Sequence, residues 1–164
     1  MIAARWHARG DIRIEEVALR EPRADEAVIR VHWCGICGTD LEEYRAGPLT
    51  IPVGVPHPQS GRMAPPTLGH EVVGEVVRAA ADGSGPRVGT LVAPDVVNGC
   101  GSCWWCVRHQ EGLCPQVSVP GQQDDGGLAE FMITRARTCV PIPDGLPLET
   151  AVLAEPKIGR ASCR

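Results

Sequence analysis

The chain has 164 residues, with sixteen Lys and Arg, twenty Asp and Glu, and a formal net charge of −4. This length is enough for one domain with a hydrophobic core and short of two. The acidic balance argues against a nucleic-acid or anionic-membrane surface, and no apolar run reaches the roughly 18 residues of a transmembrane helix. Because the N-terminus has no signal-type apolar core and the chain has eight cysteines, we expect a cytoplasmic protein that uses cysteine for metal binding or catalysis.

Short strands are predicted along most of the chain, since nineteen glycines and fifteen prolines supply many turns. In chain order the expected strands lie within Ile2–His7, Ile12–Val17, Ala27–Trp33, Leu68–Arg78, Thr90–Val97, Leu128–Thr134 and Cys139–Pro143. A long loop is expected over Pro48–Pro66. Many short strands with few helices favour a small β-barrel or sandwich.

Two short helices are expected. The first covers Leu41–Arg45, with Thr39 or Asp40 as its N-cap and a following glutamate, Glu42 or Glu43, closing a capping box. The second starts near Leu148.

Four cysteines follow the spacing C-x2-C-x2-C-x7-C: Cys100, Cys103, Cys106 and Cys114. Closely spaced cysteines can wrap one tetrahedral Zn²⁺, and a closed shell of four thiolates makes that zinc structural. Two disulfides or free thiols are the alternatives, but disulfides are rare in reducing compartments. A zinc-stapled module that binds nucleic acid or protein is a further alternative, although Arg108 is the one basic Lys or Arg residue inside the motif.

A second set of candidate ligands is Cys37, His70, Glu71 and Glu155. A catalytic zinc has three protein ligands and an open fourth position, and its ligands often come from distant loops. Taken singly, a histidine is more often a satisfied or exposed side chain, and a cysteine is more often a small buried hydrophobe.

Four motifs nevertheless occur in a fixed order: Cys37-Gly-Thr-Asp40, Gly69-His-Glu71, the four-cysteine motif and Ala154-Glu-Pro156. Together they resemble the zinc-dependent medium-chain alcohol and polyol dehydrogenases over residues 1–156. The long loop, with its His-Pro-Gln-Ser-Gly run from His57, is most similar to the 2,3-butanediol dehydrogenase branch, near sorbitol and threonine dehydrogenases. The resemblance implies a mainly β fold with short helices, namely a GroES-like, partly open β-barrel catalytic domain with a four-cysteine zinc lobe.

The resemblance also implies a role for each matching residue. Cys37 and His70 would bind the catalytic zinc, and Glu71 would be a third ligand or exchange with water. Glu155 would bind the metal or its water. Cys100, Cys103, Cys106 and Cys114 would hold the structural zinc, so two zinc ions are expected per chain.

Proton transfer would involve residues that follow Cys37 closely in the chain. Asp40 would orient the His70 ring through its second nitrogen, and Thr39 would accept a hydrogen bond from the zinc-bound alcohol and pass its proton on. Relatives often carry His where this chain has Glu42, and that His is the last group that passes the proton to solvent. A carboxylate has a lower pKa than an imidazole, so the last step of proton transfer would differ in this chain.

The implied reaction is hydride transfer between a secondary alcohol, such as a vicinal diol or acyloin of the 2,3-butanediol/acetoin type, and NAD or NADP. The implied partners are a small alcohol or ketone substrate, with no nucleic acid and no membrane. The longer protein would be a homodimer or homotetramer. A sorbitol- or threonine-type dehydrogenase is the alternative within the family.

The nucleotide-binding Rossmann domain of the family is expected to be missing, because no βαβ unit with a Gly-rich turn follows. Residues 157–164 have no apolar periodicity, match nothing in the family and can be back-translated into a sequencing-adapter sequence. We therefore expect a truncated enzyme, inactive by itself, with a non-native tail over residues 157–164. Cys163 is then neither a ligand nor a disulfide partner, and Cys34 and Cys139 are predicted to pack in the interior.

Overall fold

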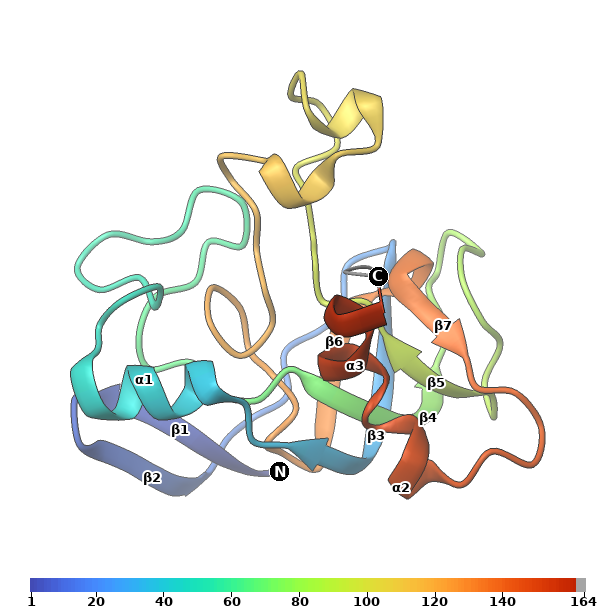
Figure 1. The fold of residues 1–164 in the computed structure, drawn as a ribbon, viewed down its shortest axis with the longest axis horizontal. Coiled ribbons are helices and arrows are strands. Elements are labelled where there is room, and N and C mark those ends of the chain that lie inside the picture. Colours follow the sequence, from blue (N-terminus) through green and yellow to red (C-terminus); the bar gives the residue numbers. More distant parts are fainter. Residues whose placement is uncertain (162–164) are drawn as a thin grey trace.

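The strands form two antiparallel sheets, and the computed structural model describes residues 1–161 (Figure 1). In chain order the strands and α-helices are β1 (Ile2–Ala8), β2 (Asp11–Glu16), β3 (Glu26–Gly35), α1 (Gly38–Ala46), β4 (Glu71–Arg78), β5 (Leu91–Pro94), β6 (Phe131–Arg135), β7 (Cys139–Pro141), α2 (Leu148–Ala151) and α3 (Ala154–Ala161). Three 3-10 helices are η1 (Cys106–Arg108), η2 (Glu111–Leu113) and η3 (Ala136–Thr138). The fold is mainly β with short helices, as predicted.

The larger sheet has the strand order β6-β3-β4-β5-β7, and the smaller sheet is the hairpin β1-β2. Two isolated bridges, Ala3 with Ala129 and Arg5 with Thr67, join the hairpin to segments that precede β6 and β4. The barrel that results is partly open, as expected. All pairings between the named strands of residues 1–161 are antiparallel, so the parallel sheet of a dinucleotide-binding domain does not occur in this part of the chain.

The main core lies against the larger sheet. Its buried members are Ala27, Ile29, Val76, Ala80, Val92, Ala136 and Cys139. Ala27 and Ile29 point to the same face of β3 because side chains alternate along a strand. Burial raises the pKa of the Cys139 thiol to about 12, so this cysteine is a protonated packing residue, as predicted.

A second core cluster holds the long loop that follows α1. Trp6, Ile51 and Leu68 are buried together, and Ala64 and Leu128 pack against them. The loop therefore lies on the β1 side of the molecule although it has little regular structure.

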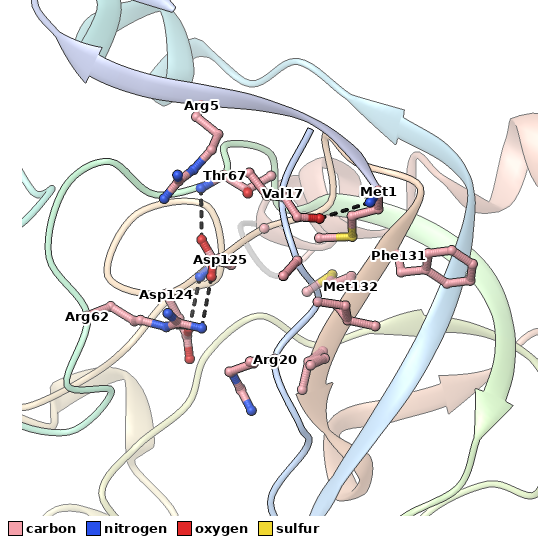
Figure 2. Close-up of a pocket in the computed structure, with 14 residues that line it drawn as sticks. Met1, Arg5, Val17, Arg20, Arg62, Thr67, Asp124, Asp125, Phe131 and Met132 are labelled. Atoms are coloured by element: carbon pink, nitrogen blue, oxygen red, sulfur yellow. Dashed lines mark hydrogen bonds and ion pairs between the residues drawn. The ribbon is translucent and has the colours of Figure 1, made fainter. Parts of the chain in front are cut away.

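Ion pairs tie the same loop to the segment before β6, at the rim of a cavity of about 330 Å³ (Figure 2). Arg62 Nη2 lies 3.0 Å from Asp125 Oδ2, and Arg62 Nε lies 3.5 Å from Asp124 Oδ1. Asp125 Oδ1 also accepts the backbone N–H of Thr67 at 3.0 Å. These contacts fix the long loop and Thr67 against Asp124 and Asp125, in the segment before β6.

Helix α1 begins earlier than predicted. Its N-cap is Cys37, so the prediction of Thr39 or Asp40 as the N-cap is wrong. The Asp40 carboxylate accepts the Cys37 N–H at 2.9 Å, and the Cys37 sulfur accepts the N–H of Asp40 in return. A thiol can thus take the place of a hydroxyl in a capping box.

Several other boundaries differ from the predicted ones. Strand β5 ends at Pro94 rather than Val97, and β6 begins at Phe131 rather than Leu128. Periodicity alone did not show where these strands leave the larger sheet, because their apolar runs continue into residues that bond to other segments: Leu128 and Ala129 pair with the β1 hairpin, and Asp95 N donates to the Thr138 carbonyl.

The C-terminal helical segment is divided between α2 and α3, and α3 runs on to Ala161. Helix α3 therefore includes Lys157 and the first residues of the expected non-native tail, whose origin stays a prediction, and the prediction for Cys163 lies outside the described residues. No helix within residues 1–161 is long and apolar enough to cross a bilayer.

Candidate metal centres

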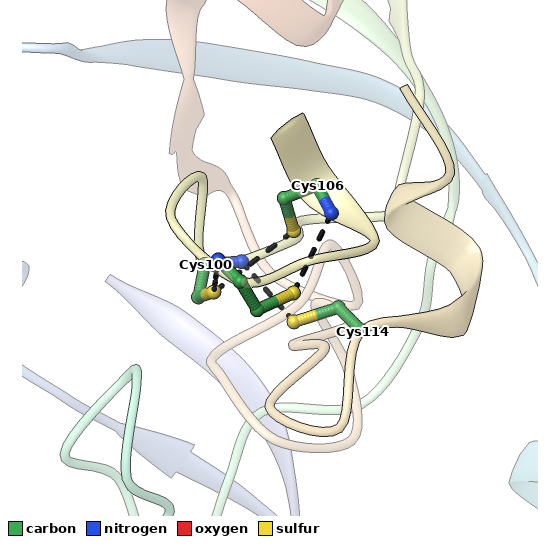
Figure 3. Close-up of side chains that lie close together, drawn as sticks. Cys100, Cys106 and Cys114 are labelled. Atoms are coloured by element: carbon green, nitrogen blue, oxygen red, sulfur yellow. Dashed lines mark hydrogen bonds between the residues drawn. The ribbon is translucent and has the colours of Figure 1, made fainter. Parts of the chain in front are cut away.

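The four-cysteine segment forms a lobe that projects from the sheets, shown in yellow in Figure 1. The four sulfurs of Cys100, Cys103, Cys106 and Cys114 all lie within 4.8 Å of one another (Figure 3). All four are free thiols, so the alternative of two disulfides is not adopted. The spacing thus brings together four ligand atoms at separations that one tetrahedral ion can span.

Backbone N–H groups of the lobe point at these sulfurs. Cys103 N donates to Cys100 Sγ at 3.3 Å, Cys106 N donates to Cys103 Sγ at 3.4 Å, and Cys100 N and Gln116 N donate to Cys114 Sγ at 3.4 Å. Hydrogen bonds from the Ser102 and Cys103 backbone lower the pKa of Cys100 to about 6, whereas burial raises the pKa of Cys106 to about 12. Sulfurs this close cannot all ionise without a cation, because like charges repel, and a divalent cation removes that repulsion.

A second cluster joins three of the predicted ligands. Ligand atoms of Cys37, His70 and Glu71 lie within 4.8 Å of one another. Cys37 comes from the start of α1, and the other two come from the start of β4, with His70 only 4% exposed and Glu71 9% exposed. One thiol, one imidazole and one carboxylate form a donor set typical of a catalytic zinc, which keeps a fourth position open.

Two glycines make room for these ligands. Gly69, directly before His70, has φ of +88°, and a Cβ on it would lie 2.7 Å from both Cys34 Sγ and Leu128 Cγ. A Cβ on Gly35 would collide with the Glu71 carboxylate. Burial raises the pKa of Cys34 to about 12, with the nearby negative charges adding to the rise, so Cys34 packs here as a protonated thiol, as predicted.

Asp40 links the two segments that carry the ligands. Its Oδ2 accepts the Cys37 N–H, and its Oδ1 accepts the Gly69 N–H at 3.3 Å. The same Oδ1 lies 4.0 Å from His70 Nδ1, which is longer than a hydrogen bond, and Nδ1 is buried with no hydrogen-bond partner in the described structure. Asp40 therefore fixes the backbone at Cys37 and at Gly69, the residue before His70.

Thr39 lies next to the ligand set. Its Oγ1 is 3.4 Å from His70 Nε2, and its hydroxyl can both donate and accept a hydrogen bond. Glu42 is exposed on the same helix. The structure thus places Thr39 beside the cluster and Glu42 at the surface of α1.

The cluster opens on a largely apolar cleft of about 750 Å³. Its lining includes Cys37, Val72, Val96 and, from the α3 side, Glu155. Glu155 lies outside the group of three ligand atoms that gather among the described residues. Burial raises its pKa; His70 opposes that shift, while Glu71 and Asp95 add to it, which places Glu155 within electrostatic reach of the cluster.

From the sequence, Glu43 was assigned no place near the candidate site. Glu43 is 2% exposed, and its carboxylate accepts hydrogen bonds from the loop after α1 rather than closing the capping box. Its spacing from Asp40 was the available signal, because helical residues three apart share a face.

Comparison with known proteins bears on this arrangement. Residues 23–144 match the family model of the alcohol dehydrogenase GroES-like domain. The (R,R)-butanediol dehydrogenase of Bacillus subtilis strain 168 is 37% identical over 160 residues, which cover 95% of this chain and 44% of that protein. The X-ray crystal structure of 2R,3R-butanediol dehydrogenase from Bacillus subtilis has a TM-score of 0.86 at 36% identity, covering 95% of this chain and 44% of that one.

A third relative is a structure from Escherichia coli CFT073, described as a short chain alcohol dehydrogenase complexed with the cofactor NADH. It has a TM-score of 0.81 at 28% identity and covers 95% of this chain and 42% of that one. The chain thus spans less than half the length of the relatives that it matches. Since the family model covers most of the sequence and the first relative matches nearly all of it, the chain belongs to the alcohol dehydrogenase GroES-like domain family.

Proposed function

We propose that this chain is the zinc-binding catalytic domain of an oxidoreductase that transfers hydride between a secondary alcohol and NAD or NADP. The observation that carries the proposal is the presence of two separate ligand clusters, one of four thiols and one of mixed donors. A closed four-thiolate cluster suits a structural ion, and an incomplete mixed cluster beside a cleft suits a catalytic one.

The residues fit these ions in two respects. In the lobe, backbone N–H groups stabilise the thiolate form that a metal requires. In the mixed cluster, buried donors of three kinds converge, with Cys37 and His70 as two ligands and Glu71 as the third ligand or one that exchanges with water. Glu155 faces the same cleft and would bind the metal or its water.

A zinc ion in the mixed cluster would act as a Lewis acid that lowers the pKa of an alcohol. Thr39 Oγ1, beside His70, would accept a hydrogen bond from the alcohol and, as it takes the alcohol proton, release its own hydroxyl proton toward solvent. Glu42, exposed further along α1, would be the group that receives it. Asp40 would keep the Cys37 and His70 segments in place by its two backbone hydrogen bonds.

The apolar lining of the cleft fits a small aliphatic substrate. Likeness to butanediol dehydrogenases favours a vicinal diol or acyloin of the 2,3-butanediol/acetoin type. A sorbitol- or threonine-type substrate is the second candidate within the same reaction class. The NADH complex of a relative favours a nicotinamide cofactor.

The cofactor would be held by residues outside this chain, so the 164-residue chain alone would be inactive. The longer protein would be a homodimer or homotetramer. Seven free thiols within the described residues fit a reducing, cytoplasmic setting.

A different class of function, a zinc-stapled binding module, requires only the lobe. The mixed cluster of Cys37, His70 and Glu71 argues against it, since such a module has no use for a second set of buried ligands. Metal analysis of the purified chain separates the two functions. Two zinc ions per chain are expected for the oxidoreductase domain, and one zinc per chain would leave only the binding module.

A further inference from the structure

The proposed zinc chemistry gives no role to Glu43. Its carboxylate is nevertheless buried and accepts hydrogen bonds from the loop that follows α1. It accepts the backbone N–H groups of Leu49, Thr50 and Ile51 at 2.9, 2.5 and 3.2 Å. It also accepts the Thr50 hydroxyl at 2.7 Å. Burial alone would raise the pKa of Glu43, but these hydrogen bonds hold it below its ordinary value, so the group is a charged carboxylate.

The backbone of Glu43 is bound as well. Its carbonyl oxygen accepts Trp6 Nε1 at 3.0 Å and the Gly47 N–H at 2.9 Å. A Cβ on Gly47 would collide with both the carbonyl and the carboxylate of Glu43. This one residue therefore fixes α1 to β1 and to the loop that follows the helix.

From that loop, contacts lead to the turn that carries His70. Gln123 Nε2 donates to the Thr50 carbonyl at 3.0 Å. Gln123 lies between Gly121 and Gly127, and both of these glycines pack on Gly69. A Cβ on Gly121 would lie 2.7 Å from the Gly69 carbonyl oxygen, and Gly127 N donates a hydrogen bond to the same oxygen at 2.8 Å. A continuous set of contacts thus runs from α1 through the loop to the residue before the histidine ligand.

We propose that Glu43 is a positioning residue for the centre formed by Cys37, His70 and Glu71. It sets the position of Cys37, which caps α1, relative to His70, which follows the glycine-packed turn. The inference rests on the proposed zinc site. A small change in this relation matters because protein ligands must match their metal distances to within about 0.2 Å.

The test uses the full 164-residue chain loaded with zinc and the variant Glu43→Gln. Glutamine keeps the shape of the side chain but turns an NH₂ group toward N–H donors and removes the charge. We expect zinc binding at the Cys37 centre to weaken by about 10–100-fold, the usual effect of losing a group that orients ligands. Zinc at the four-cysteine lobe should keep its affinity, and competition with a graded series of chelators measures both sites.

Three variants accompany this measurement. Glu16→Gln makes the same chemical change at an exposed position and should bind both ions as the wild type does. Thr50→Val removes only the hydroxyl that donates to Glu43 and should weaken the Cys37 centre by a smaller factor. Thr50→Ser retains the hydroxyl and should restore wild-type binding. Cobalt substitution gives an independent readout, because the absorption of Co²⁺ in the mixed centre depends on its ligand geometry.

The outcomes are distinct. If the wild type binds only one zinc, the proposed function fails, and this inference fails with it. If the wild type binds two and Glu43→Gln binds both with unchanged affinity, only the positioning role is overturned. An equal loss at both centres would also overturn it, since that result indicates general destabilisation. If Glu43→Gln does not fold, Thr50→Val decides: selective weakening of the Cys37 centre supports the role, and unchanged affinities contradict it.

Discussion

The carboxylate of Asp40 accepts the backbone N–H of Gly69 at 3.3 Å, which joins the first turn of α1 to the residue before His70. The bond is formed where Gly69 has φ of +88° and where a side chain on it would collide with Cys34 and Leu128. The conformation and the contacts both require glycine at this position.

Gly69→Ala should therefore lower the free energy of unfolding by about 2–5 kcal/mol, since it combines left-handed backbone strain with overpacking. Gly10→Ala is the matched control, because Gly10 has φ of +74° but nothing lies within 4 Å of its Cβ position. The control should cost about 1–2 kcal/mol. Urea unfolding of both variants measures the difference, and equal losses would show that packing at Gly69 is unimportant.

The two metal centres should respond separately to cysteine substitution. Cys37→Ala should lose one zinc and keep the fold, because the mixed cluster lies at the edge of a cleft. Cys103→Ala should lose the other zinc and destabilise the lobe, because a structural zinc contributes folding free energy. Metal analysis and thermal unfolding test both. Loss of the same ion in the two variants would contradict the assignment of two sites.

Thr39 should matter for turnover in an active enzyme that contains this domain together with a cofactor domain. Thr39→Ala should reduce kcat by about 10²–10⁴-fold, the usual contribution of a positioned proton-transfer group. Thr39→Ser keeps the hydroxyl next to His70 and should be nearly neutral. Steady-state kinetics of the pair decides, and equal losses would remove Thr39 from the relay.

The purified 164-residue chain should oxidise no secondary alcohol with NAD or NADP. The reason is that residues 1–161 contain no parallel dinucleotide-binding sheet to hold a hydride acceptor. Absorbance of reduced nicotinamide at saturating cofactor and 2,3-butanediol is the measurement. Sustained turnover by this chain would contradict the proposal that the cofactor is bound elsewhere.

Acid stability should depend on Glu26, which begins β3 and is 5% exposed. Its carboxylate accepts Arg20 Nη1 and Nη2 at 2.6 and 2.8 Å and the Arg23 N–H at 2.7 Å. Burial by itself would raise the pKa of Glu26, but Arg20 and Arg23 hold it below its ordinary value of 4.5. The stabilisation is therefore fully present above about pH 4.5 and is lost as the pH falls through the lowered pKa.

Glu26→Gln should accordingly lower the free energy of unfolding at neutral pH by about 1.5–3 kcal/mol. The difference from the wild type should shrink as the pH falls below 4.5, because the wild-type carboxyl then becomes neutral too. Unfolding titrations across this range measure it. A difference that does not change with pH would show that the charge of Glu26 is unimportant.

Much of the fold was predictable because the responsible signals are local. The alternation in Ala27–Trp33 identified β3, and the spacing of the cysteines identified the lobe. The ends of β5 and β6 were not predictable, since pairing partners rather than composition decide where a strand stops. The cap of α1 was missed because a cysteine, a rare capping residue, took the place that the sequence assigned to Thr39 or Asp40.

In the candidate site too, residues in local motifs were predictable and their distant contacts were not. Cys37, His70 and Glu71 could be named from motifs, but their convergence depends on Gly69 and on segments far away in sequence. The role of Glu43 could not be predicted, because its partners are main-chain N–H groups, and such groups leave no mark in a sequence.

Because Glu43 binds the main chain of the loop, the identity of an exposed loop residue is free to change without loss of the hydrogen bond. Leu49 is such a position, since its side chain is 57% exposed while its N–H is held by the carboxylate. A library that varies Leu49 can remodel the outer surface of the domain while the backbone beneath keeps its geometry.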